Sequence, residues 1–126
     1  MQSLKQQAVD MAYRHIMKQG PSVDKTLIQK NKCVYLSPTN KMCAASIFLV
    51  NNEAREANEN CSIAGVPHSH IHPYWRDLPI KFLVKLQNAH DQASFTDSLE
   101  GFKKEFSLHI GILCKKYKLN MPTVVV

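Results

Sequence analysis

The apolar stretch at residues 33–50 constrains the fold of this chain more than any other feature. It reads CVYLSPTNKMCAASIFLV. Two short runs rich in β-forming residues, 33–37 and 42–46, flank the turn-prone residues 38–41, so the pattern predicts a β-hairpin. The apolar run continues to Val50, and long helical patterns lie on both sides of it. We therefore expect this stretch to form the floor on which the helices pack.

The first long helix is predicted over residues 4–19. Ser3 is a good N-cap residue, Gln6 stands at capping-box spacing from it, and Gly20 with Pro21 gives a stop signal. The face expected to be buried follows three- and four-residue steps: Leu4, Ala8, Met11, Ala12, His15 and Ile16.

Two further helices are predicted in the middle of the chain. A short, solvated helix is expected over residues 52–58, which are polar and rich in Glu and Ala. A second long helix is expected over residues 78–91, with Asp77 as its N-cap and Pro79 in its first turn. Its apolar face contains Ile80, Phe82, Leu83, Leu86, Gln87, Ala89 and His90.

The last helix is predicted to start near Asp97 or Ser98 and to end near Leu119, before the stop signals Asn120 and Pro122. It carries the clearest apolar stripe in the chain: Leu99, Phe102, Phe106, Ile110, Leu113 and Tyr117. The tail at 123–126 has strand character and is expected to pair with the hairpin edge or to fray.

These elements together predict an α+β fold. A chain of 126 residues is long enough to bury about two-thirds of its unfolded surface in one core. We therefore expect a single domain over residues 1–126, in which three long helices and one short helix pack around a small antiparallel β-hairpin.

Charge and cysteine content bear on the partner and the compartment. The net charge of +6 and the pI near 9.2 favour an acidic partner, whether nucleic acid or an acidic protein surface. The N-terminus lacks an apolar signal core, and the longest uncharged apolar run, 42–50, is far shorter than the roughly 20 residues of a membrane span. We expect a cytoplasmic protein without membrane contact and with reduced thiols: Cys33, Cys43, Cys61 and Cys114.

The loop at residues 61–79 concentrates histidines. In an extended conformation the alternating side chains of His68, His70 and His72 would line one face, and Cys61 would close a fourth metal position. Prolines on both sides favour instead an irregular polar loop. We therefore predict no metal and no cofactor, and keep a zinc-stabilised or zinc-dependent module as an alternative.

The chain carries no motif for catalysis. A Gly-rich phosphate loop, a G-x-S-x-G elbow and an H-E-x-x-H helix are all missing from the sequence. We therefore predict no catalytic residue and a protein that is not an enzyme.

Two surfaces have the composition of a binding site. The loop tripeptide at 74–76 combines two aromatic residues with an arginine, which is typical of a protein-binding hot spot, although Trp75 could instead fold back to plug the core. The last two long helices carry many lysines, Lys81 and Lys85 among them, and those of the last helix share a side opposite its apolar stripe, as phosphate contacts require. DNA or RNA is therefore an alternative partner. The predicted partner-binding residues are Tyr74, Trp75, Arg76, Lys104, Lys115 and Lys118.

Two segments carry a family pattern. Residues 33–46 follow C-x-Y-x-x-P-x-G-x-x-C-A-x-G, with Asn40 and Ser46 in place of the two glycines, and residues 86–91 read LQNAHD, followed by Phe102 and Phe106. This resembles a widespread family of small uncharacterised proteins from tailed phages and prophages. The resemblance implies a phage accessory protein that binds a host protein complex and inhibits or redirects it, for example as an anti-CRISPR or other anti-defence inhibitor.

Overall fold

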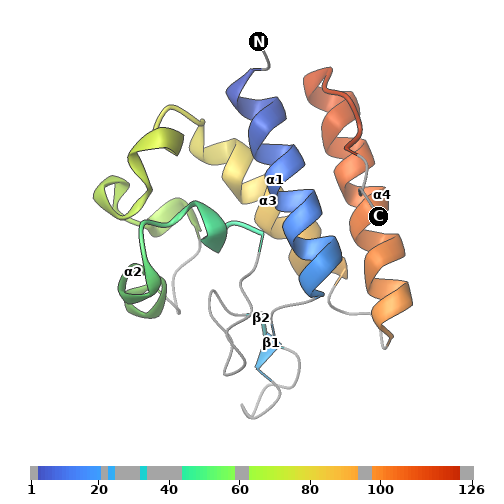
Figure 1. The fold of residues 1–126 in the computed structure, drawn as a ribbon, viewed down its shortest axis with the longest axis horizontal. Helices are drawn as coiled ribbons and strands as arrows, with labels where there is room; N and C mark the ends of the chain where they lie inside the picture. Colours follow the sequence, from blue (N-terminus) through green and yellow to red (C-terminus); the bar gives the residue numbers. More distant parts are fainter. Residues whose placement is uncertain are drawn as a thin grey trace.

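Three long helices form a bundle in the computed structural model, which describes residues 3–20, 23–24, 32–33, 44–58, 63–93 and 98–122. They are α1 (Leu4–Gln19), α3 (Ile80–Ala93) and α4 (Leu99–Tyr117). Figure 1 shows them side by side, with α3 and α4 antiparallel. The most extensive packing is between α3 and α4, and α1 contacts both.

A layer of short elements lies beside the bundle (Figure 1). It contains the short helix α2 (Asn52–Ala57) and four single 3₁₀ turns, and η2 is the turn that packs on α3. The turns are η1 (Ser46–Phe48), η2 (Ile63–Gly65), η3 (His68–His70) and η4 (Pro73–Trp75).

The predicted α+β class is wrong, because the described part of the chain is mostly helical and contains no sheet beneath the helices. The paired strands in the described part of the chain are only two residues long: β1 (Val23–Asp24) and β2 (Lys32–Cys33), antiparallel, with Val23 opposite Cys33. The predicted hairpin paired residues 33–37 with 42–46 instead. The hairpin loop, most of the first arm and the first two residues of the second arm, residues 34–43 in all, lie outside the described residues, as does the tail at 123–126.

The second arm of the predicted hairpin is turn and 3₁₀ helix. Ala44 and Ala45 form a turn before η1, and their side chains are fully buried. The Arg55 guanidinium donates to the carbonyl oxygens of Ser46 at 2.8 Å and Leu49 at 3.1 Å, which satisfies backbone groups that a strand would have used in a ladder. The apolar residues therefore correctly indicate that this segment is buried. A buried segment can be a strand or a compact turn, and the apolar pattern does not distinguish the two.

Helix α1 forms at the predicted residues. The Gln6 backbone N–H donates to Ser3 Oγ at 3.1 Å, and Gly20, at φ 89°, closes the helix through its N–H to Ile16 O at 2.7 Å. The Gln6 side chain does not reach back to the cap. It makes two hydrogen bonds to the backbone of Asn120, through Nε2 to the carbonyl at 2.9 Å and from the backbone N–H to Oε1 at 2.8 Å.

The buried face of α1 is rotated from the predicted one. Val9 and Tyr13 are buried, whereas Met11 and His15 are only partly covered. Tyr13 stacks on Phe106 of α4, with ring centroids 6.1 Å apart. The buried face therefore turns toward α4. The periodicity of α1 alone does not predict this direction, because it depends on where α4 packs.

Helices α3 and α4 agree with the prediction except at their ends. Helix α3 starts at Ile80, two residues after the predicted first residue at 78. Ser98 caps α4 through the N–H of Gly101 at 2.9 Å, and Lys118 ends it in the left-handed conformation. The predicted apolar stripe of α4 is buried at its centre, but Leu99 is 54% exposed. None of the described helices is long and apolar enough to cross a bilayer.

Candidate functional site

A pocket lies between α3 and α4 on the outer side of the bundle. Its volume is about 190 Å³. Helix α3 contributes one side and α4 the other, and we call this site the α3–α4 pocket; its lining residues are Lys85, Asn88, Ala89, Gln92, His109, Ile112, Leu113 and Lys116. Ala89 and Leu113 are buried and form an apolar floor, whereas Ile112 is 59% exposed at the rim.

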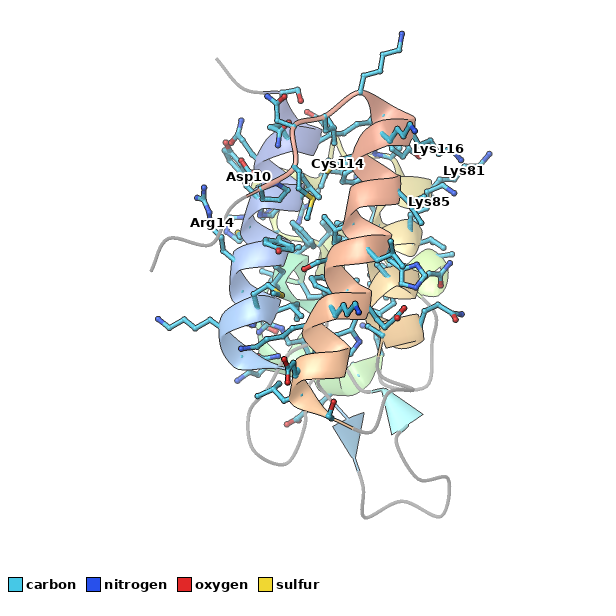
Figure 2. All side chains as sticks on the ribbon, turned by 90° about the vertical axis from the view of Figure 1, so that its right-hand side faces the viewer. Asp10, Arg14, Lys81, Lys85, Cys114 and Lys116 are labelled. Atoms are coloured by element: carbon cyan, nitrogen blue, oxygen red, sulfur yellow. The ribbon has the colours of Figure 1, made fainter. Side chains whose placement is uncertain are left out.

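Two lysines meet at one end of the pocket. Lys116 lowers the pKa of Lys85, first by favouring the neutral Lys85 amine as a hydrogen-bond acceptor and second by repulsion when both side chains are charged. Among the described residues, no carboxylate forms an ion pair with either lysine. Figure 2 shows Lys81, Lys85 and Lys116 on the same side of the bundle. This end of the pocket is therefore a concentrated positive site that lacks a neutralising group in the described structure.

The opposite end of the pocket is polar. His109 lies there with its Nε2 3.9 Å from Glu105 Oε2, one helical turn earlier on α4. Gln92 of α3 lines the same end. The pocket thus runs from a positive end over an apolar floor to an end with hydrogen-bonding side chains.

The lysines predicted from sequence do not line this pocket. Lys104, Lys115 and Lys118 are exposed, and Lys118 is the left-handed residue that ends α4. Of the lining lysines, Lys116 is next to Lys115 in sequence, and Lys85 belongs to α3. A role of Lys104, Lys115 and Lys118 in partner binding stays a prediction.

The aromatic loop residues are built into the fold to different degrees. Trp75 is partly buried and packs edge-on against Phe48, with ring centroids 5.1 Å apart. Arg76 is partly buried as well, and its Nε donates to the carbonyl of Ile71 at 2.9 Å. Tyr74 is 54% exposed, and its hydroxyl donates to Gln7 Oε1 of α1. Of the three, Tyr74 offers the most accessible surface to a partner.

The three loop histidines face different partners. They lie in and next to single 3₁₀ turns, not in the extended conformation on which the zinc hypothesis depends. His68 Nε2 donates to the carbonyl of Arg76 at 3.1 Å, His70 Nδ1 accepts from Asn58 Nδ2 at 2.9 Å, and His72 Nδ1 accepts from the N–H of Tyr74 at 3.2 Å. No group of three metal-binding side chains occurs in the described residues, and Cys61 lies outside them.

A backbone bridge fixes this loop to the apolar stretch. The N–H of Val50 donates to His70 O at 2.8 Å, and the N–H of His72 donates to Phe48 O at 2.9 Å. The bridge pairs Leu49 with Ile71, and both of these residues are buried. The loop is therefore an integral wall of the core, and Trp75 closes part of that wall.

Sequence reasoning missed the α3–α4 pocket, although a signal for it is present. On α3, Lys85 and Gln92 are seven residues apart, and on α4 His109 and Lys116 have the same separation. Seven residues make two turns of helix, so antiparallel packing places the lysines at one end and the polar pair at the other. The pattern becomes visible only once the register between the two helices is known.

In comparisons with known proteins, no family model, no curated protein and no solved structure matches this chain.

Proposed function

We propose that this protein acts by binding an acidic partner protein at the α3–α4 pocket, without catalysing a reaction. The observation that carries the proposal is that Lys85 and Lys116 both line one end of an apolar pocket whose rim exposes Ile112 (Figure 2). Two neighbouring cations that have no carboxylate partner among the described residues are best neutralised by an anionic ligand.

The exposed apolar residues favour a protein over other acidic ligands. Leu108 is 56% exposed and Ile112 is 59% exposed, one turn apart on α4. Aliphatic side chains gain by burial against other apolar groups, and a protein surface supplies such groups next to carboxylates. The charge of +6 adds long-range attraction to an acidic surface.

The resemblance to phage accessory proteins suggests which partner to look for. We propose a host protein complex in the bacterial cytoplasm, which the protein inhibits or redirects, with anti-defence activity, including an anti-CRISPR role, as one form of this. This part of the proposal rests on analogy with the family pattern at residues 33–46 and 86–91.

Nucleic acid is the second candidate partner. Lys81, Lys85 and Lys116 lie on one side of the bundle (Figure 2), as a phosphate-binding surface requires. This candidate predicts affinity for DNA or RNA that falls steeply with salt.

The test is an affinity capture from host lysate with and without nuclease, followed by mass spectrometry. Three forms are compared: the wild type, Lys85→Gln/Lys116→Gln, and the control Arg14→Gln/Lys18→Gln, which loses the same charge from the exposed side of α1. The proposal predicts a stoichiometric protein partner that survives nuclease, is lost with the pocket variant and is retained by the control. Recovery that vanishes with nuclease would favour nucleic acid, and equal capture by all three forms would contradict the assigned site.

A further inference from the structure

The geometry points to one kind of occupant for the α3–α4 pocket: a short amphipathic α-helix of the partner. Its carboxylate lies between Lys85 and Lys116, and an aliphatic side chain one turn further along enters the pocket. This inference rests on the proposed function and specifies the chemistry that the partner presents.

The length of the pocket matches a helical segment. Lys85 and Gln92 on α3, and His109 and Lys116 on α4, each span seven residues, or about 10.5 Å along a helix axis. A partner helix lying in the groove presents about two turns over that distance. One turn then reaches the lysine end and the next reaches the polar end, which is the helix-in-groove mode of recognition.

The floor of the pocket has room for one side chain. Ala89 and Leu113 form the floor and Ile112 the rim. The volume of about 190 Å³ exceeds the roughly 150 Å³ of an apolar cavity that admits benzene. A leucine, isoleucine or phenylalanine of the partner therefore fits, and its burial also covers the exposed part of Ile112.

A carboxylate is the group that suits the lysine end. Its two oxygens accept hydrogen bonds from two ammonium groups at once. In the free protein the proximity of Lys116 lowers the pKa of Lys85, so a bound anion converts an unfavourable pair into two charge-assisted contacts. At the other end, His109 and Gln92 provide hydrogen bonds to polar groups of the same helix.

A phosphate backbone satisfies only half of this arrangement. Phosphates would neutralise Lys81, Lys85 and Lys116, but they would leave Ile112 and the apolar floor facing polar atoms. An acidic helix satisfies both the charged end and the apolar floor. We therefore commit to a helical protein segment, and nucleic acid becomes an outcome of the test.

The probes are short synthetic peptides stapled into a helix, each carrying a Glu and a Leu three or four residues apart on one face. Two matched peptides replace the Glu by Gln or the Leu by Ala. Affinities are measured by fluorescence anisotropy against the wild type, Lys85→Gln/Lys116→Gln and Arg14→Gln/Lys18→Gln, with single-stranded DNA and RNA as further probes. The inference predicts that either peptide substitution, or the pocket variant, weakens binding about ten-fold or more, and that the α1 control changes it less than about two-fold.

Charge reversal provides the sharper test. The variant Lys85→Glu/Lys116→Glu should reject the Glu peptide and bind a Glu→Lys peptide, because the complementarity is restored with opposite signs. Equal binding of the Glu and Gln peptides, or binding of nucleic acid but of no peptide, would overturn the inference. A captured partner without peptide binding would refute this inference and leave the proposed function standing, whereas the absence of any captured protein would refute the proposed function itself.

Discussion

Replacing Trp75 by alanine separates a structural role of the loop from a binding role. Trp75 packs edge-on against Phe48, at 5.1 Å between ring centroids, and against Tyr74, at 4.7 Å. A fully buried Trp→Ala change costs about 3–5 kcal/mol. Because Trp75 is only partly buried, we expect a loss of about 2 kcal/mol in the free energy of unfolding, or roughly 8 °C in Tm at this chain length.

The assay is urea unfolding followed by circular dichroism, with partner capture measured on the folded protein. Trp75→Phe keeps an aromatic edge against Phe48 and should lose less than about 1 kcal/mol. Tyr74→Phe removes only an exposed hydroxyl contact with Gln7 and should be nearly neutral. If Trp75→Ala unfolds like the wild type while partner capture is abolished, the structural role of Trp75 in the core is refuted and Trp75 is a binding hot spot.

Three further predictions concern the described fold. Gln6→Ala removes two hydrogen bonds between the Gln6 side chain and the backbone of Asn120 and should cost about 1 kcal/mol; unchanged urea unfolding would contradict this. Gly20→Ala should cost about 1–2 kcal/mol in the same assay, because its φ is 89° and an added Cβ would lie 3.1 Å from Leu99 Cδ1; a stabilised variant would refute that strain. Burial lowers the pKa of His15 below 6.5 in the folded protein, so on acidification the unfolded chain binds the proton before the folded protein does. The stability contributed by neutral His15 is therefore complete above about pH 6.5 and is lost as the pH falls from there through the folded pKa. An NMR titration that places the folded pKa at or above 6.5 would contradict the sign.

The long helices were predictable because their signals are local. Ser3 and Ser98 accept the capping hydrogen bonds expected of N-cap residues, and Gly20 stops α1 as expected. The buried face of α1 was less predictable, because Tyr13 is buried by stacking on Phe106 of another helix. Periodicity identifies a helix reliably, but which of several adjoining faces is covered depends on its neighbours.

The hairpin and the pocket depend on contacts distant in sequence. Residues 44–49 are buried except for Ile47, and Arg55 donates to the carbonyls of Ser46 and Leu49. An apolar run contains no residue pattern that predicts these hydrogen bonds from Arg55. The meeting of Lys85 and Lys116 likewise depends on the register between α3 and α4, which the sequence of either helix alone does not determine.

The central claim, that the α3–α4 pocket is the partner-binding site, is tested most directly by lysine footprinting of the captured complex. Amine-reactive labelling is compared between the free protein and the complex by mass spectrometry, with Lys18 on the exposed side of α1 as the internal reference. The account predicts that Lys85 and Lys116 are strongly protected in the complex and that Lys18 is labelled equally in both states. Labelling of Lys85 and Lys116 that does not change on complex formation would contradict it.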